Sequence, residues 1–313
     1  MDKDKDRDKT GRKVLAVDIG GSQVTVACVD GAGQVLERSR AALSGGVTQE
    51  ILIDAVERGA GRLDLRGAEA AGVNIPGLAD AKNGIWVHAP YSGVSDFAVA
   101  EKLARALGLP VYIENDVNAC ALAEKRFGLC ADIGDYIWVT VSSGIGGSLV
   151  LNGGLYGGHA GNAGEIGHFI VEESGGFKCG CGNTGCLEAM AAGPGIARLY
   201  GALSGGQVAP EMRSKEVGEL ARAGDAHAAA AFAKSGYYIG KALAYAVNFV
   251  NPEAVILGGG VMMDEELIMP AVKSNFSRFV FERANSGVRI MRTALGYDAA
   301  LLGAATLALI NLK

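Results

Sequence analysis

Three cysteines and one histidine in a glycine-rich stretch have the types and spacing of a metal site. The cysteines follow the pattern C-x-C-x4-C at Cys179, Cys181 and Cys186, and His168 precedes them by ten intervening residues. Zn2+ accepts both thiolate and imidazole in tetrahedral sites. Glycines between the thiols suit a tight metal-binding loop. We therefore expect a Cys3His site for structural zinc.

Two other interpretations of these cysteines are weaker. Buried or redox-active thiols would not need the intervening glycines. A zinc ribbon that binds nucleic acid would need basic residues, but the chain has a net charge of −5 and Lys178 is the only lysine or arginine from 153 to 188. Twelve of those 36 residues are glycine, so ordering them costs about 1–2 kcal/mol each. Binding of a zinc ion would offset about 10–16 kcal/mol of this entropic cost. The rest of the stretch must therefore be ordered by packing on the protein.

Two acids lie beside the metal ligands although zinc does not need them. Glu165 stands three residues before His168, and Glu188 stands two residues after Cys186. One imidazole and two carboxylates held next to a rigid metal loop could hydrogen-bond the hydroxyl groups of a polyol. We expect Glu165, His168 and Glu188 to bind such a ligand.

A strand that ends in an acid and a glycine tip forms a second group. Val14–Asp18 is apolar up to its final carboxylate, Ile19–Ser22 follows, and a second strand covers 24–29. This pattern predicts a β-hairpin and excludes a P-loop or a dinucleotide-binding turn, because both require a helix after the glycines. Ile-Gly-Gly-Ser recurs at 145–148, with Ser142–Ser148 as the expected tip, which predicts two similar sheets.

Such tips could bind phosphate. Their backbone N–H groups form concavities for anions, and two of them could hold successive phosphates of a nucleotide. Asp18 could hold Mg2+ through water. The alternative is that Gly-Gly-Ser is only a hairpin turn, but the presence of two copies favours nucleotide binding. The expected nucleotide-binding residues of the tips are Asp18, Gly20, Gly21, Ser22, Ser143, Gly144, Gly146 and Gly147.

A strand-to-helix corner carries a candidate base. A strand at 111–113 runs into Glu114-Asn115-Asp116, and a helix is expected at 119–127. The structural alternative is an N-cap. If Asn115 caps the helix, Asp116 lies in the first turn with its carboxylate free, where the helix dipole favours ionisation. Asp116 is then placed to accept a proton from a bound hydroxyl.

The remaining periodicity predicts elements that position these groups. A buried strand at 69–75 ends in Pro76-Gly77, and another at 254–257 is closed by Gly258-Gly259-Gly260, which fits close approach by a flat ligand such as adenine. The pattern also predicts helices at 47–62, 99–107, 195–202, 214–223, 225–249 with a break near Ser235-Gly236, 264–276 and 298–310.

Length and composition bound the class of protein. At 313 residues the chain is long enough for two domains. No apolar run is long enough to span a bilayer. The first nine residues alternate in charge and predict a solvated tail rather than a signal peptide. Cys28, Cys120 and Cys130 are expected to be buried thiols; with no disulfide framework left, we expect a cytoplasmic protein.

Together these motifs resemble the ROK family, whose sugar kinases have an actin-like fold. The resemblance covers Val14 to Ile310 and depends most on Gly164-Glu-Ile-Gly-His168 and on Cys179-Gly-Cys181-Gly-x-x-Gly-Cys186-Leu-Glu188. Asp18–Ser22, Ser143–Gly147 and Glu114–Asn118 resemble the two phosphate motifs and the catalytic corner.

The resemblance implies an α/β fold of two actin-like, ribonuclease H-like domains with a cleft between them and a zinc knuckle in the second. The expected boundaries are a tail at 1–13, a first domain at 14–117 with the helix at 298–313 packed on it, and a second domain at 118–297.

The implied activity is ATP-dependent phosphorylation of a hexose, foremost glucose to glucose 6-phosphate, with Asp116 as general base. His168 would use one ring nitrogen for zinc and the other for sugar. ATP, Mg2+ and structural Zn2+ are the implied cofactors, a homodimer the implied assembly, and neither nucleic acid nor membrane a partner. The implied sugar-binding residues are Gly77, Asn115, Asp116, Glu165, His168 and Glu188.

Departures from the family pattern keep alternatives open. Ser22-Gln23 and Ser142–Gly144 differ from the usual phosphate motifs but retain a hydroxyl, whereas Ala89–Gly93 differs in the segment that would line the sugar pocket. A kinase for N-acetylmannosamine, N-acetylglucosamine or fructose is therefore an alternative. A sugar-sensing repressor would need a winged helix before the first phosphate motif, and thirteen residues precede Val14. An actin-like scaffold would not need Asp116, Glu165 and the knuckle together.

Overall fold

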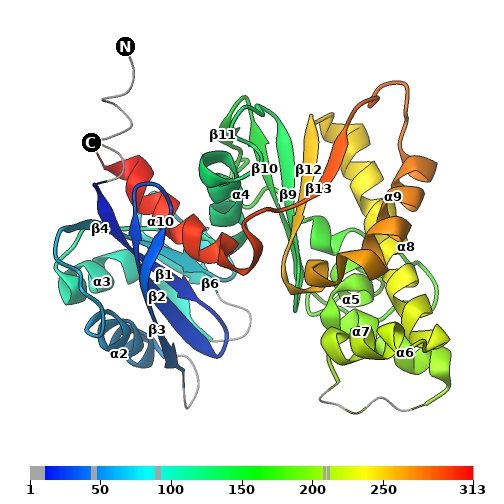
Figure 1. Cartoon of the computed structure of the whole chain (residues 1–313), viewed down its shortest axis with the longest axis horizontal. Coiled ribbons are helices and arrows are strands. Elements are labelled where there is room, and N and C mark those ends of the chain that lie inside the picture. Colours follow the sequence, from blue (N-terminus) through cyan, green and yellow to red (C-terminus); the bar gives the residue numbers. More distant parts are fainter. Residues whose placement is uncertain (1–10, 44–47, 89–92, 207–208, 210–211, 313) are drawn as a thin grey trace. The chain divides into compact units, whose positions relative to one another are not determined.

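The computed structural model describes residues 11–43, 48–88, 93–206, 209 and 212–312. It divides into two compact units (Figure 1). Unit 1 comprises 1–132, 158–162 and 298–313, and unit 2 comprises 133–157 and 163–297. Most of the expected tail and most of the Ala89–Gly93 segment lie outside the described residues.

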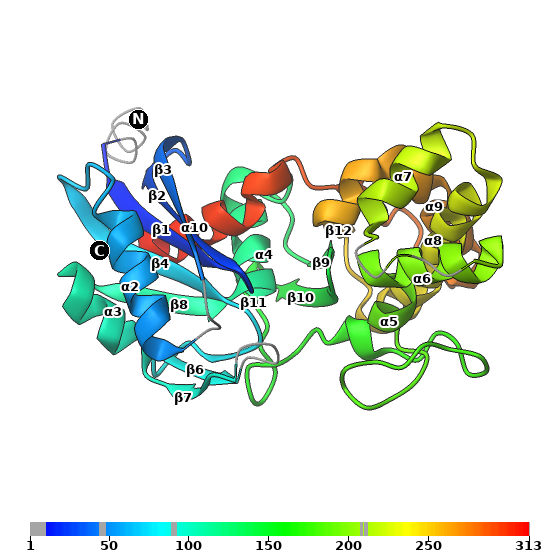
Figure 2. The ribbon, with the colours of Figure 1, turned by 90° about the horizontal axis from the view of Figure 1, so that it is seen from below.

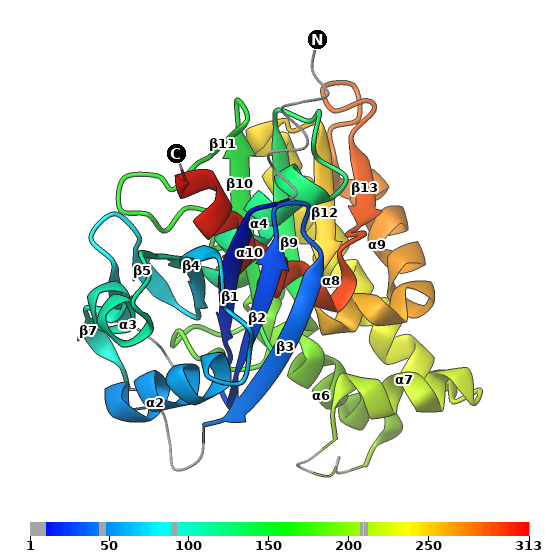
Figure 3. The ribbon, with the colours of Figure 1, turned by 60° about the vertical axis from the view of Figure 1, so that its left-hand side comes forward.

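Unit 1 is built on a five-stranded sheet with the order β3-β2-β1-β4-β8. The first three strands are antiparallel (Figure 3), and β4 and β8 continue the sheet in parallel with β1. Strand β1 is central, and its residues 14–17 are all buried because both faces are covered. The strands are β1 Lys13–Ile19, β2 Gln23–Asp30, β3 Val35–Ala42, β4 Ala68–Ile75 and β8 Val111–Asn115.

Helices cover both faces of this sheet (Figure 2). Helices α2 (Gln49–Ala60) and α3 (Val99–Leu107) contribute to one core with alternate residues of β1 and β4. Helices α10 (Ala299–Asn311) and α4 (Asp116–Phe127) pack together, with α10 against β1 and β4. Gly72 makes this possible, because a Cβ there would overlap the carbonyl oxygen of Ala304 in α10. A small antiparallel sheet completes the unit, with strands β5 Leu78–Asp80, β6 Ile85–His88 and β7 Ser95–Phe97.

Unit 2 repeats the strand order of unit 1. Its sheet runs β11-β10-β9-β12-β13, again with an antiparallel hairpin on one side and parallel strands on the other. The two similar sheets expected from the repeated glycine motif are therefore present. The strands are β9 Tyr136–Val141, β10 Ile145–Leu151, β11 Gly154–Leu155, β12 Ala254–Gly258 and β13 Arg289–Arg292.

Helices on the sheet of unit 2 form its own core. They are α5 Leu187–Ala191, α6 Gly193–Ser204, α7 Ser214–Arg222, α8 Ala226–Val250 and α9 Glu265–Phe279. The expected break at Ser235-Gly236 is wrong, because α8 is continuous. Gly236 instead lets α9 approach, since a Cβ there would lie 2.8 Å from the carbonyl oxygen of Ile268.

The unit boundary also differs from the expected one. We expected the second domain to begin at Asn118, but unit 1 continues to Asp132. The reason is helix α4, which packs on α10: a Cβ at Gly303 would lie 2.7 Å from the carbonyl carbon of Ala119. Within the described ranges, no helix has the combination of length and apolar character that a membrane crossing requires.

Candidate functional site

The candidate base lies at the junction of β8 and α4. Asn115 is the N-cap of α4, and its side-chain oxygen accepts hydrogen bonds from the backbone N–H groups of Val117 (2.9 Å) and Asn118 (3.1 Å). Its amide nitrogen donates to the carbonyl oxygen of Gly77 (2.9 Å) and to Asp116 Oδ1 (3.1 Å). Asn115 therefore holds Gly77 and Asp116 in place with its full set of hydrogen bonds.

Asp116 occupies the first turn of α4, as expected from the capping argument, but its carboxylate is not entirely free. Oδ1 also accepts the N–H of Val117 at 2.9 Å. Burial, followed by the nearby charge of Asp18, raises the pKa of Asp116 to about 6. The group can thus exchange a proton near neutral pH, as a general base must.

Asp18 approaches the same corner from β1. It pairs in register with Asn74 on β4, and the Asn74 side chain bonds to both Asp18 and the carbonyl oxygen of Ala300. Burial raises the pKa of Asp18, while the bond from Asn74 opposes that rise. The negative charges of the two carboxylates repel each other, so a bound cation would stabilise the pair.

Sequence reasoning assigned no role to Asn74 or Glu114. Asn74 is fully buried, and its Oδ1 has no hydrogen-bond partner among the described residues. Glu114 pairs in register with Asn74, and its carboxylate accepts hydrogen bonds from the Asn115 N–H and the Asn118 side chain. The signal was available: Asn74 is the one polar residue of the otherwise apolar run at 70–75. A carboxylate and a buried amide oxygen without a partner are oxygen donors of the kind that Mg2+ prefers.

The first glycine tip has an open backbone. The chain turns through Gly20, Gly21 and Ser22 between β1 and β2, and the Gly20 N–H donates to the carbonyl oxygen of Gln23 at 2.9 Å. A Cβ at Gly21 would meet no atom within 4 Å. Gly21 also does not have a positive φ. Neither crowding within the protein nor backbone conformation therefore requires glycine at this position, and the open space suits a ligand.

The second tip differs from the expected one. Strand β10 begins at Ile145, so the turn comprises only Ser142–Gly144, while Gly146 and Gly147 lie within the strand. A Cβ at Gly147 would lie 2.6 Å from the carbonyl oxygen of Gly164. The two Ile-Gly-Gly-Ser copies therefore occupy different positions in their hairpins. Gly147 is needed for packing against the metal-binding segment.

Packing and backbone conformation within the protein explain two of the three glycines after β12. A Cβ at Gly258 would lie 2.5 Å from the ring of Trp138, and Gly259 has a φ of 92° and faces the backbone of Val141. Only Gly260 has an open side, with Ser142 Oγ at 3.9 Å as its nearest neighbour.

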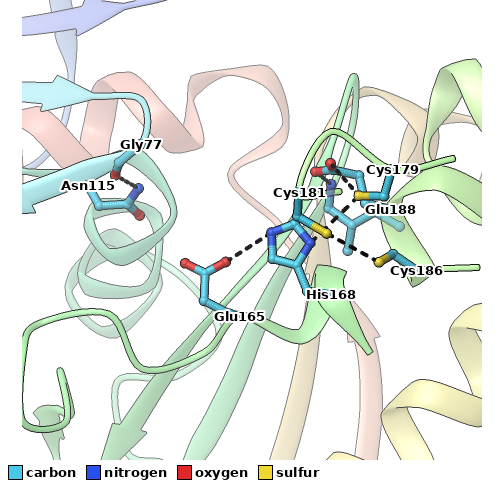
Figure 4. Close-up of polar contacts among 9 residues, drawn as sticks. Gly77, Asn115, Glu165, His168, Cys179, Cys181, Cys186 and Glu188 are labelled. Carbon is cyan, nitrogen blue, oxygen red and sulfur yellow. Dashed lines mark hydrogen bonds and ion pairs between the residues drawn. The ribbon is translucent and has the colours of Figure 1, made fainter. Parts of the chain in front are cut away.

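The four expected metal ligands converge in unit 2. His168 Nδ1 lies 3.8 Å from Cys179 Sγ, and Cys181 Sγ lies 3.6 Å from Cys186 Sγ (Figure 4). All four ligand atoms lie within 4.8 Å of one another. Ligands about 2.3 Å from a tetrahedral zinc ion would be about 3.8 Å apart, so the cluster fits that metal.

The surroundings of the thiols support metal binding. Burial raises the pKa of Cys186 to about 12, so a nearby cation is what would hold it as a thiolate. The loop is closed by hydrogen bonds of Cys179 N–H to Asn183 (2.9 Å) and Gly182 N–H to Cys179 (3.1 Å). Gly182 has a φ of 97°, which explains its glycine.

The acids beside the cluster point in different directions. Glu165 Oε2 lies 3.7 Å from His168 Nε2, on the opposite ring edge from the thiols, and its side chain is 58% exposed. Glu188 Oε2 instead accepts the N–H of Ile145 at 3.1 Å, and its Oε1 lies 4.0 Å from Cys179 Sγ. Glu165 is thus available to a ligand, whereas Glu188 already has a partner in the protein.

The site residues divide between the units. Unit 1 holds the two aspartates, the first tip, Gly77 and Asn115, and unit 2 holds the second tip, the glycines after β12, the metal ligands and the two glutamates. Unit 1 brings together the carboxylates of Asp116 and Asp18, which a cation would stabilise. Unit 2 offers a Cys3His cluster that could hold a metal ion, with the exposed carboxylate of Glu165 beside its imidazole.

Comparisons with known proteins identify the family of the chain. A model of the ROK family matches residues 14–310. A glucokinase from Halalkalibacterium halodurans is 31% identical over 310 residues, covering 93% of each chain. The DNA-binding transcriptional dual regulator NagC of Escherichia coli is 29% identical over 302 residues, covering 92% of this chain and 73% of the regulator.

Solved structures give the same result. The ROK family glucokinase from Streptomyces griseus, in complex with glucose and AMPPNP, has a TM-score of 0.82 to this chain and 31% sequence identity. The match covers 95% of this chain and 99% of the glucokinase.

Proposed function

This chain belongs to the ROK family, and on that basis we propose that it is an ATP-dependent hexose kinase with glucose as its foremost substrate. The observation that carries the proposal is Asp116: a half-buried carboxylate at the end of β8, with its pKa raised to about 6, beside a second carboxylate suited to a cation. The likeness to a glucokinase structure that contains glucose and AMPPNP supports the choice of substrates.

In the proposed reaction Asp116 accepts the proton of the attacking sugar hydroxyl. The hydroxyl oxygen then bonds to the γ-phosphorus of ATP, the bond from that phosphorus to the bridging oxygen breaks, and ADP leaves. Mg2+ when bound would neutralise charge on the phosphates, and Asp18 and Asn74 are the residues that would hold its water shell. The backbone N–H groups of Gly21 and Ser22 and those of Ser143–Gly144 would bind phosphate oxygens.

The sugar hydroxyls are assigned to residues with free capacity. Glu165 is exposed beside His168 Nε2, so these two groups can bind a hydroxyl together. A bound zinc ion would fix the imidazole through Nδ1 and orient Nε2. Asn115 could contact sugar only by replacing its bond to Asp116, and Gly77 lies beside it through their hydrogen bond.

A coupled ATP-consumption assay tests the proposal. Glucose, mannose, fructose, N-acetylglucosamine and N-acetylmannosamine should be compared at equal concentrations, with the phosphorylated product identified by mass spectrometry. We expect the highest kcat/KM with glucose. A preference for an N-acetylated sugar or fructose would change the substrate but not the reaction. Sugar binding without turnover of any sugar would instead favour a sensing role, as in the regulator to which the chain is similar.

The substitution Asp116→Asn tests the role of Asp116 as the base. We expect a loss of turnover of about 10²–10⁴-fold, while binding of sugar and AMPPNP, measured by calorimetry, stays within a few-fold of the wild type. The asparagine oxygen can still accept the Val117 N–H, so the fold should be retained. Unchanged turnover would remove Asp116 from the role of base.

A further inference from the structure

Glu188 connects the metal cluster with the second glycine tip. It lies in the first turn of α5, directly after the ligand Cys186. One carboxylate oxygen lies 4.0 Å from Cys179 Sγ (Figure 4). The other accepts the N–H of Ile145 at 3.1 Å. Ile145 is the residue where the turn of Ser142–Gly144 enters β10. A single side chain thus touches a metal ligand and the backbone of the expected phosphate-binding turn.

The turn itself is shaped around this carboxylate. A Cβ at Gly144 would lie 2.5 Å from Glu188 Oε2. The φ of Gly144 is not positive, so the glycine is explained by this contact: a side chain there would displace the carboxylate. The carboxylate therefore occupies the space that a side chain at Gly144 would take, and it fixes the path of the backbone on that side of the turn.

Backbone contacts reinforce the connection. The segment that leads to His168 lies directly on β10, because a Cβ at Gly167 would overlap the carbonyl oxygen of Ile145 and one at Gly164 would overlap that of Gly147. On the far side of α5, the Gly193 N–H donates to the carbonyl oxygen of Ser142 at 2.8 Å. The turn is thus held from both sides by the segments that precede and follow the cysteines.

From these contacts we propose that Glu188 is a positioning residue for the nucleotide, coupling metal binding at the Cys3His cluster to nucleotide binding at the Ser142–Gly144 turn. This inference rests on the proposed function, because it assigns the turn to the phosphates. Metal binding orders Cys179, which lies near the Glu188 carboxylate, and Cys186, which is the N-cap residue of α5. Glu188 then holds the Ile145 N–H, and the turn keeps its shape before nucleotide arrives. The affinity for nucleotide rises because the turn is already ordered, so binding costs less conformational entropy.

The test measures AMPPNP binding to the full-length, zinc-loaded protein with Mg2+ and without sugar, by calorimetry. Glu188→Ala removes the acceptor of the Ile145 N–H, and we expect AMPPNP to bind roughly tenfold or more weakly. Glu188→Gln keeps an oxygen acceptor and should restore most of the affinity. Glu173→Ala, which removes an exposed carboxylate from the same glycine-rich stretch, is the matched control and should bind AMPPNP as the wild type does.

Metal content separates positioning from loss of the cluster. We expect the Glu188→Ala protein to retain one zinc ion per chain and to show faster hydrogen exchange at the Ile145 amide. Wild-type protein stripped of zinc should show the same two changes, weaker AMPPNP binding and faster exchange. Should Glu188→Ala fail to fold, hydrogen exchange at the Ile145 amide of the wild type, measured with and without zinc, supplies a second test, because it leaves every side chain unchanged.

The possible failures are distinguishable. Wild-type affinity for AMPPNP in Glu188→Ala, or in the zinc-free protein, would overturn the coupling but leave the kinase proposal standing. Absence of AMPPNP binding by the wild type itself would contradict the kinase proposal, and the coupling with it.

Discussion

The raised pKa of Asp116 makes a prediction about the pH dependence of activity. A base must be ionised before it can accept a proton, and burial together with Asp18 raises the pKa of this carboxyl to about 6. Activity should therefore fall as the pH drops through about 6, with a slope of one proton. The profile of kcat/KM against pH from 5 to 9 measures this, because it reports on the free enzyme. A profile that stays flat down to pH 5 would contradict the assignment.

The same pKa predicts the stability of the Asp116→Asn variant. The folded protein has a higher pKa at Asp116 than the ordinary value of 3.8, so ionisation destabilises the folded state as the pH rises through about 6. Removing the charge should make the variant more stable at pH 8, by on the order of 1–3 kcal/mol. The advantage should shrink towards pH 5, where the wild-type group is itself mostly protonated. Urea unfolding at several pH values tests both the sign and the trend.

Among the elements, the contact between β4 and α10 gives the sharpest prediction. A Cβ at Gly72 would overlap the carbonyl oxygen of Ala304 and lie 2.8 Å from its carbonyl carbon. Backbone cannot give way as a flexible side chain can, so Gly72→Ala should destabilise unit 1 by roughly 3 kcal/mol or more. Urea unfolding measures the loss. Gly21→Ala is the control, since its added Cβ meets nothing within 4 Å and it should leave stability unchanged.

Several elements follow from their own residues. Helix α3 ends where Gly108 adopts a φ of 67°, as the position of the glycine predicted. Helix α8 does not break at Gly236 as its sequence predicted. Gly236 and Gly240 instead allow α9 to pack closely against the helix. A glycine within a helix pattern has two possible reasons, and only the neighbouring element distinguishes them.

For the whole molecule, the two units offer independent reporters. The chain has two tryptophans: Trp86 is buried in unit 1 and Trp138 in unit 2, each 1% exposed. All four candidate metal ligands belong to unit 2. Proteins with more than one core often unfold in more than one step. A bound metal should therefore stabilise the folded state of unit 2, whose unfolding Trp138 reports.

Chelation in reducing buffer tests this prediction. Removing zinc should lower the urea midpoint reported by Trp138 fluorescence and leave that of Trp86 unchanged, because binding energy at a structural zinc site is folding energy. The variants Trp86→Phe and Trp138→Phe isolate the two signals. Equal shifts at both tryptophans would show that the units unfold together, and no shift at either would argue against a structural metal.

By itself the sequence was sufficient to predict most strands of the two five-stranded sheets, most helices, the position of Asp116 at the corner of β8 and α4, and the Cys3His cluster. These depend on local periodicity, capping and ligand spacing, which neighbouring residues carry. The tertiary structure alone decided that Asn74 binds Asp18, that the second tip is only Ser142–Gly144, and that Glu188 holds Ile145. Each of these depends on strand register or on contact between residues far apart in the chain, and no local pattern records which partner a side chain will meet.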